Sequence, residues 1–149
     1  MRIALGADHA GFALKQSIAE HLRAVGHEVL DLGTDSEDRV DYPDYGAAVG
    51  RSVAGGDAEL GVCVCGSGIG IAIAANKVPG VRAATVHDVT SAHLAREHND
   101  ANVVCIGERL TGPAVALEAV DAFVAASFEG GRHAGRVAKI DALLPAPSR

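Results

Sequence analysis

The sequence contains very few aromatic residues. It has three Phe, two Tyr and no Trp among 149 residues, and 19 acidic residues against 13 basic ones make the formal net charge −6. Nucleic-acid-binding proteins rely on basic surface and on aromatic rings that stack against bases. The composition therefore predicts that the chain has no nucleic-acid partner.

Cysteines and long apolar runs are also scarce. The chain has three Cys, an odd number, and Asp8 interrupts the first apolar run before a signal-peptide core could form. No apolar run approaches the roughly 20 residues that span a bilayer. We therefore expect a cytoplasmic protein with reduced thiols and no membrane partner.

Apolar segments alternate between strand-like and helix-like patterns along the chain. Such alternation is typical of a parallel sheet with helices on both faces. We predict a three-layer α/β/α Rossmann-like domain with a five-stranded parallel sheet over residues 1–143, followed by a frayed C-terminal tail over residues 144–149. The predicted strands are 2–7, 28–32, 60–65, 81–86 and 103–106, the predicted helices are 12–25, 45–54, 69–76, 89–97, 113–128 and 132–143, and residues 35–44 form an acidic loop.

A glycine-rich loop follows the third predicted strand. Residues 65–70 read Cys-Gly-Ser-Gly-Ile-Gly and lead into a helix, whose first N–H groups carry partial positive charge. Ligands of open α/β sheets bind at the carboxyl ends of strands, so this loop can hold a phosphate or a developing oxyanion. The spacing does not match Gly-x-Gly-x-x-Gly, and no Gly-Lys-Ser/Thr follows, which disfavours a dinucleotide or Walker A site. The alternative is a tight turn that needs small residues.

Cys65 lies where this strand meets the glycine-rich loop. A helix N-terminus stabilises a thiolate, so Cys65 can act as a base or a nucleophile, or it can be a small buried hydrophobe. Cys63 points to the same face but deeper in the sheet, and Cys105 lies inside a strand, so we interpret both as buried hydrophobes. No other Cys or His is near in sequence to complete the four ligands of a zinc site, and we expect no bound metal.

Asp8 and His9 follow the first strand at the same edge of the sheet. His9 could bind an anionic group there. Asp8 or His9 could instead cap the next helix, and the two interpretations are compatible.

His98 and Asn99 lie between a predicted helix and the next strand, at the amino edge of the sheet and so opposite Cys65. If His98 acts together with Cys65, the two residues should come from different subunits of a symmetric dimer. The alternative is a helix C-terminus at which His98 interacts with the helix dipole and Asn99 is a left-handed cap.

Arg132 and Arg136 are spaced i, i+4 and share one face if the segment is helical. Together with Arg109 they suit a phosphate or carboxylate ligand, because guanidinium groups bind such oxygens in bidentate pairs. The alternative is a solvated helix end.

Taken together, these segments resemble the B-type ribose-5-phosphate isomerase family, which also includes galactose-6-phosphate isomerase subunits. The resemblance covers about residues 1–142 and rests on segments 6–12, 41–43, 65–77, 96–102 and 130–136. It implies the interconversion of an aldose phosphate and a ketose phosphate without metal or cofactor, with ribose 5-phosphate and ribulose 5-phosphate as the leading pair. It also implies a homodimer with its active site at the subunit interface, and leaves open whether dimers pair into tetramers.

The resemblance also implies residue roles. Cys65 resembles the general base, His98 resembles the group that opens the furanose ring, and Ser67 resembles part of the loop that holds the enediolate. Substrate and phosphate contacts are implied for Asp8, His9, Tyr42, Gly66, Gly68, Ile69, Gly70, Asn99, Arg109, Arg132 and Arg136.

One departure within the family bears on the mechanism. Some members lack the Cys and use a Glu on the following helix, but residues 71–74 here read Ile-Ala-Ile-Ala, without a carboxylate. The resemblance therefore implies the Cys mechanism for this chain.

Two other functions stay open within isomerases. The substrate could be a four-carbon or six-carbon sugar phosphate, or the reaction could depend on a metal, in which case a chelator would stop it. A non-catalytic sugar-phosphate binding module on the same scaffold is the reading from another functional class.

Overall fold

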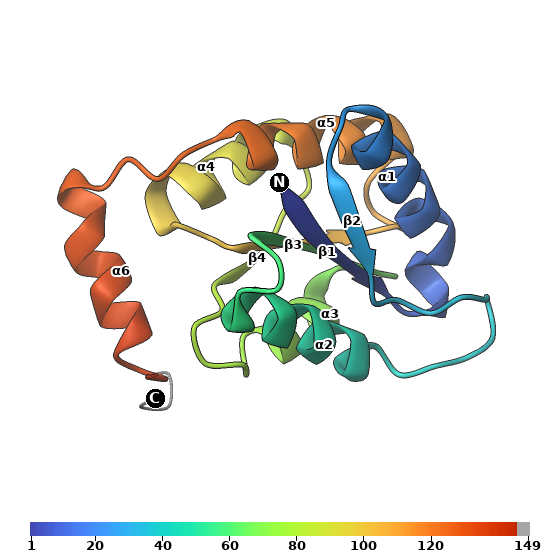
Figure 1. The fold of residues 1–149 in the computed structure, drawn as a ribbon, viewed down its shortest axis with the longest axis horizontal. Helices are drawn as coiled ribbons and strands as arrows, with labels where there is room; N and C mark the ends of the chain where they lie inside the picture. The colour runs from blue at the N-terminus through green and yellow to red at the C-terminus, as the bar shows by residue number, and fades with distance from the viewer. Residues whose placement is uncertain (146–149) are drawn as a thin grey trace.

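The computed structural model describes residues 1–145, in which strands and helices alternate around one parallel sheet (Figure 1). The predicted three-layer arrangement with a five-stranded parallel sheet is confirmed. Of the predicted C-terminal tail, residues 146–149 lie outside the described residues. The strands are β1 (Arg2–Ala7), β2 (Glu28–Asp31), β3 (Leu60–Cys65), β4 (Ala83–Thr85) and β5 (Val103–Gly107). The helices are α1 (Phe12–Ala24), α2 (Tyr42–Gly55), α3 (Ile69–Ala75), α4 (Val89–Asn99), α5 (Pro113–Ala125) and α6 (Ala134–Asp141), with the 3₁₀ turns η1 (His9–Gly11) and η2 (Gly131–His133).

The strands are ordered β2-β1-β3-β5-β4 across the sheet. β1 pairs with β2 on one side and with β3 on the other, so the direction of chain progress reverses between β1 and β3. Ligands of open parallel sheets bind outside the carboxyl ends of the strands at such a switch point. The loops that follow Ala7 and Cys65 meet there.

Two helical layers cover the sheet (Figure 1). The layer of α1, α4 and α5 buries Ile18 and Phe123 on one face, and the layer of α2 and α3 buries Val49 and Ile71 on the other. β3 is buried along its whole length, as the apolar run of residues 60–65 predicts. Because β3 and its neighbours are rigidly packed, the residues at their ends are held in fixed positions.

Some element boundaries differ from prediction. α2 begins at Tyr42, three residues earlier than predicted, because Pro43 is tolerated in the first helical turn where its missing N–H breaks no hydrogen bond. α5 ends at Ala125 rather than at residue 128, and the last helix begins only at residue 134. Gly130 and Gly131 have φ of +65° and +50°. This left-handed backbone is not helical, so the last helix cannot extend back through these two residues.

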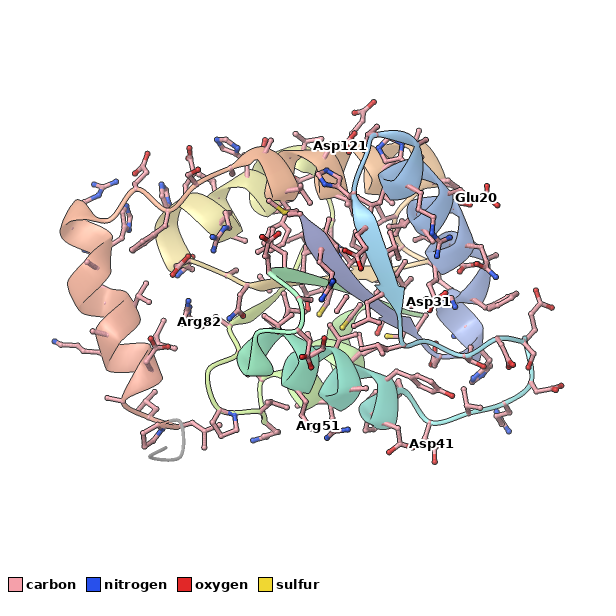
Figure 2. The ribbon with its side chains drawn as sticks, viewed as in Figure 1. Glu20, Asp31, Asp41, Arg51, Arg82 and Asp121 are labelled. Carbon is pink, nitrogen blue, oxygen red and sulfur yellow. The ribbon has the colours of Figure 1, made fainter. Side chains whose placement is uncertain are left out.

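Helix α6 stands apart from the two layers at one end of the molecule, while α1 lies toward the other end (Figure 1). Arg82 ties α6 to the body, since its Nη1 lies 2.9 Å from Asp141 of α6 and its Nη2 lies 2.9 Å from Asp100. Figure 2 shows Arg82 in the space between α6 and the rest of the chain. Among residues 1–145, no helix has the length and apolar character needed to cross a bilayer.

Candidate active site

An open pocket of about 570 Å³ lies at the carboxyl edge of the sheet, around the switch point between β1 and β3. This volume lies within the range of roughly 300–1,000 Å³ that is usual for small-ligand sites. Nine of the predicted site residues line it, namely Asp8, His9, Tyr42, Cys65, Gly66, Ser67, Ile69, Gly70 and Arg109. The pocket also includes Ala10, Arg39 and Leu110.

Cys65 lies at the floor of this pocket. It is the last residue of β3, only 4% of its surface is exposed, and its side chain faces the layer of α2 and α3. The backbone N–H of Gly68 donates a hydrogen bond to its sulfur at 3.1 Å. A thiolate accepts such a bond more strongly than a thiol does, so the loop is arranged to stabilise the reactive form of Cys65.

Two glycines determine the shape of the loop after β3. Gly68 has φ of +75°, a left-handed conformation in which the chain turns into α3, and a Cβ at this position would come within 2.8 Å of the backbone of Ile106. Gly70 lies against the ring of Tyr42, where a Cβ would come within 2.7 Å of the ring carbons. Gly68 is buried and does not line the pocket, so its contribution is to the loop conformation, whereas Gly70 lets Tyr42 close one wall.

Asp8 and His9 form the opposite side of the pocket, after β1. The buried Asp8 carboxylate accepts hydrogen bonds from the N–H groups of Ala10 and Gly11 at 3.0 and 3.1 Å, so the capping interpretation of Asp8 is confirmed. The Nδ1 atom of His9 lies 3.2 Å from the carbonyl oxygen and 3.3 Å from the N–H nitrogen of Val40. The backbone at residue 40 thus engages Nδ1, which leaves Nε2 as the nitrogen that can reach a ligand.

The loop after β2 is fastened at both ends. At its start the Lys15 ammonium, which is almost fully buried, donates to the Asp31 carboxylate at 2.8 and 2.9 Å and to the Thr34 carbonyl at 2.7 Å. Asp31 lies at the carboxyl end of β2 (Figure 2). At its other end the loop is held by His9 and Val40. These two anchors place Arg39 in the wall of the pocket.

The pocket collects positive charge although the chain is acidic. The guanidinium of Arg109 lies beside Gly66. The backbone N–H of Arg109 donates a hydrogen bond to the Gly66 carbonyl at 3.1 Å. Arg109, Arg39 and His9 line the same pocket. This arrangement can bind a small anion together with the polar groups of a sugar.

The remaining predicted residues form a second group away from this pocket. His98 and Asn99 end α4, whereas Arg132 lies in η2 and Arg136 in α6. None of the four lines the pocket around Cys65. The helix cap predicted at Asn99 is wrong: Asp100 takes the left-handed conformation, with φ of +46°, and Asn99 is the last helical residue.

The second group contains the one cluster of potential metal ligands found among residues 1–145. Nitrogen or oxygen atoms of His98, Glu129 and His133 lie within 4.8 Å of one another. The Nε atom of Arg132 already donates to Nε2 of His133 at 3.2 Å, so that nitrogen is engaged within the protein.

The other two cysteines lie in the core between β3 and β5. Cys63 and Cys105 are register partners, and both are fully buried, which confirms their interpretation as buried small residues. The hydrogen bond that the Cys105 thiol donates to Cys63, followed by burial, raises the pKa of Cys105 well above its usual value. Cys105 therefore stays a neutral thiol.

Comparison with known proteins identifies the family of this chain. Residues 3–140 match the family model described as Ribose/Galactose Isomerase. The chain belongs to this family. It is 49% identical over 142 residues to ribose-5-phosphate isomerase B of Escherichia coli, covering 95% of each chain. It is also 41% identical to galactose-6-phosphate isomerase subunit LacB of Clostridium acetobutylicum, covering 97% of this chain and 84% of that one. The structure of Clostridium thermocellum ribose-5-phosphate isomerase B superposes with a TM-score of 0.95 at 49% identity, covering 96% of this chain and 97% of that one.

Arg39 lines the pocket of this chain but is not among the site residues predicted from the sequence. Arg39 is the one basic residue in a loop interpreted as acidic, residues 35–44. That loop also follows a strand and therefore begins at the carboxyl edge, which is the signal that could have identified it. Leu110, next to Arg109, was missed for a different reason, because an apolar side chain in a loop carries no chemical signature.

Proposed function

We propose that this chain is a ribose-5-phosphate isomerase that interconverts ribose 5-phosphate and ribulose 5-phosphate, with Cys65 as the base. The observation that carries the proposal is the placement of Cys65 in a pocket with cationic walls, with the Gly68 N–H directed at its sulfur at 3.1 Å. Family membership supports the reaction class, and the proteins named as ribose-5-phosphate isomerases support the substrate.

In the proposed reaction, the Cys65 thiolate removes the proton from C2 of the open-chain aldose and forms an enediolate. The same proton, or one exchanged from solvent, is then delivered to C1, while the proton of the C2 hydroxyl moves to the C1 oxygen. Carbon acids of this kind need both a base and stabilisation of the oxyanion. We assign the second task to Ser67 and to the backbone N–H groups of residues 66–70.

The phosphate of the substrate needs cationic partners. His9 and Arg109 line the Cys65 pocket, and Arg132 and Arg136 belong to the second group. We assign all four to the phosphate and the sugar hydroxyls, together with Asp8, Tyr42 and Asn99. The pocket-lining Arg39 adds one more cation to this set.

His98 has the proposed role of opening the furanose ring. The bond between C1 and the ring oxygen breaks, the ring oxygen takes a proton from His98, and the C1 hydroxyl releases its proton to water as it becomes the aldehyde. His98 does not line the Cys65 pocket of its own chain. We therefore propose a homodimer in which the second group of one subunit completes the Cys65 pocket of the other. This second group, His98 and Asn99 with Arg132 and Arg136, is called the His98 group below.

Several finer points are part of the same proposal. We propose residues 1–143 as one catalytic domain, a cytoplasmic location and a role in pentose phosphate metabolism. The relative named as a galactose-6-phosphate isomerase subunit keeps a six-carbon sugar phosphate as the second candidate substrate, at lower identity than the ribose-5-phosphate isomerase relative. A four-carbon sugar phosphate is the third.

The test is turnover by the purified protein on four-, five- and six-carbon aldose phosphates in the presence of a chelator. We expect the highest kcat/KM with ribose 5-phosphate, unchanged by the chelator. Preference for another sugar would replace the substrate, and loss of activity with the chelator would indicate a metal-dependent reaction. Binding of sugar phosphates without turnover of any would favour a binding module.

A further inference from the structure

The rings of His98 and His133 lie face to face, with centroids 4.3 Å apart and planes within 10° of parallel. His98 belongs to the last turn of α4 and His133 to η2, so the two residues come from different elements. The side chain of His133 is 8% exposed, whereas that of His98 is 34% exposed. His133 is therefore the inner wall against which the accessible His98 ring rests.

The surroundings of His133 hold its ring in one chemical state. Arg132 Nε donates to His133 Nε2 at 3.2 Å, and because a guanidinium nitrogen can only donate, Nε2 must be an acceptor without a proton. The ring is then neutral and carries its proton on Nδ1. Burial, followed by the charges of His98, Arg132 and Arg136, lowers the pKa of His133, while Glu129 opposes this shift.

Glu129 faces both rings from the segment before η2. Its carboxylate lies 3.7 Å from Nε2 of His133 and 4.0 Å from Nε2 of His98. The backbone N–H of Glu129 donates to the carbonyl of Glu97 at 3.0 Å, which fixes this segment against the end of α4. An imidazolium at His98 would have its charge balanced by this carboxylate and by the C-terminal carbonyl groups of α4.

We propose that His133 is a positioning residue for His98: its buried, neutral ring, held by Arg132, sets the orientation in which His98 transfers a proton to the ring oxygen of the sugar. Glu129 balances the charge on His98. The inference rests on the proposed function, in which His98 opens the furanose ring. It assigns His133 no contact with the substrate, so all of its effect on the reaction must pass through His98.

A double-mutant cycle tests this dependence. The variants His98→Ala, His133→Ala and the double variant are compared with the unmodified protein by steady-state kinetics on ribose 5-phosphate. We expect His133→Ala alone to lower kcat roughly 10-fold with KM within about two-fold, since small misplacements of a reacting group cost one to two orders of magnitude. In the His98→Ala background the same change should lower kcat less than about two-fold, because the group that His133 positions is already gone.

A second variant separates orientation from general packing. His133→Phe keeps the flat buried ring that stacks on His98 and loses only the hydrogen bond from Arg132, so it should recover kcat to within about three-fold of the unmodified protein. Thermal melts of all variants establish that they are folded. Equal losses from His133→Ala in both backgrounds, or an unchanged kcat for His133→Ala, would overturn the inference. Full turnover by His98→Ala would instead reject the ring-opening role of His98 in the proposed function, so the two failures are distinguishable.

Discussion

The Cys65 pocket and the His98 group are built in different ways. The pocket is formed where strands β1 and β3 end, and its residues follow buried strands directly or lie in loops fastened to them. The His98 group is formed by the end of α4, by η2 and by α6, a helix that stands apart from both layers (Figure 1). One region draws its rigidity from the sheet, whereas the other depends on side-chain contacts between short elements.

The contrast teaches that the carboxyl-edge rule locates only half of this candidate site. Strand ends bring the proposed base Cys65, the loop amides and the side chains of His9, Arg39 and Arg109 together within one chain. His98, Arg132 and Arg136 lie elsewhere, and in the proposed homodimer they reach Cys65 from a second subunit. The five predictions that follow test this division, starting from the largest expected effect.

Replacing the proposed base, Cys65, should abolish the reaction while leaving the site formed. We expect Cys65→Ala to lower kcat roughly 10³-fold or more, because a positioned general base contributes about 10²–10⁴-fold. Calorimetric titration should still detect binding of ribose 5-phosphate. Cys63→Ala is the matched control, since Cys63 lies on the same strand and face but is fully buried, and it should keep most of its turnover. Near-normal turnover by Cys65→Ala would reject Cys65 as the base.

Mixed dimers test whether the two regions cooperate across subunits. Cys65→Ala and His98→Ala chains are co-expressed with different affinity tags, and the protein carrying both tags is purified. Each heterodimer should hold one intact site and one doubly altered site, and so recover about half of the activity of the unmodified dimer, whereas each parent variant keeps only a small residual activity. Mixed dimers with no more activity than their parents would place Cys65 and His98 of one functional site in the same chain.

Loosening the His98 group should leave the Cys65 pocket intact. Arg82 joins Asp100, directly after α4, to Asp141 of α6, and its side chain is only 15% exposed. We expect Arg82→Met to lower kcat roughly 10-fold, because misplacement of reacting groups is costly. The alkylation rate of Cys65 by iodoacetamide should be unchanged. Equal changes in alkylation and turnover would show that the two regions are not separately anchored.

Arg39 tests the wall of the pocket that the sequence did not reveal. Its side chain is exposed and lies at the end of a fastened loop. We expect Arg39→Gln to raise the KM for ribose 5-phosphate about three-fold to ten-fold with little change in kcat, as expected for the loss of one exposed charged contact. Arg51, a basic residue of α2 that does not line the pocket, provides the control in Arg51→Gln. An equal effect of both changes would point to net charge rather than to a contact of Arg39.

The smallest expected effect is a pH dependence of stability located in the His98 group. Burial lowers the pKa of His133, so the unfolded chain takes up this proton more readily than the folded chain does. The folded state therefore keeps its full stability above the unfolded pKa of about 6.5, and its free energy of unfolding decreases as pH falls below that value. Melting temperatures at pH 7.5 and 5.5 should therefore differ less for His133→Phe than for the unmodified protein. An identical difference for both proteins would contradict this account of His133.

Much of the fold could be predicted because its signals are local. The buried apolar run of residues 60–65 matches β3 without error, and the glycine-rich loop after it predicts a helix at residue 69 as observed. Boundaries were less predictable where the structure depends on distant contacts. The edge strand β4 spans only Ala83–Thr85 because it pairs with β5 alone, although the apolar pattern extends over residues 81–86. The chain leaves α5 through an extended conformation at Ala126, and the 3₁₀ turn η2 begins where Gly130 and Gly131 take positive φ, so neither boundary follows from the apolar pattern.

The sequence by itself determined the class of the fold, the carboxyl-edge placement of Cys65 and the opposite placement of His98, because strand-helix alternation dictates on which edge each loop lies. Only the tertiary structure decided which side chains meet. The Gly68 N–H reaches the Cys65 sulfur, Val40 engages His9, and His133 stacks on His98. Such contacts join residues whose separation in sequence carries no periodic signal, and they form only after the apolar layers have packed around the sheet.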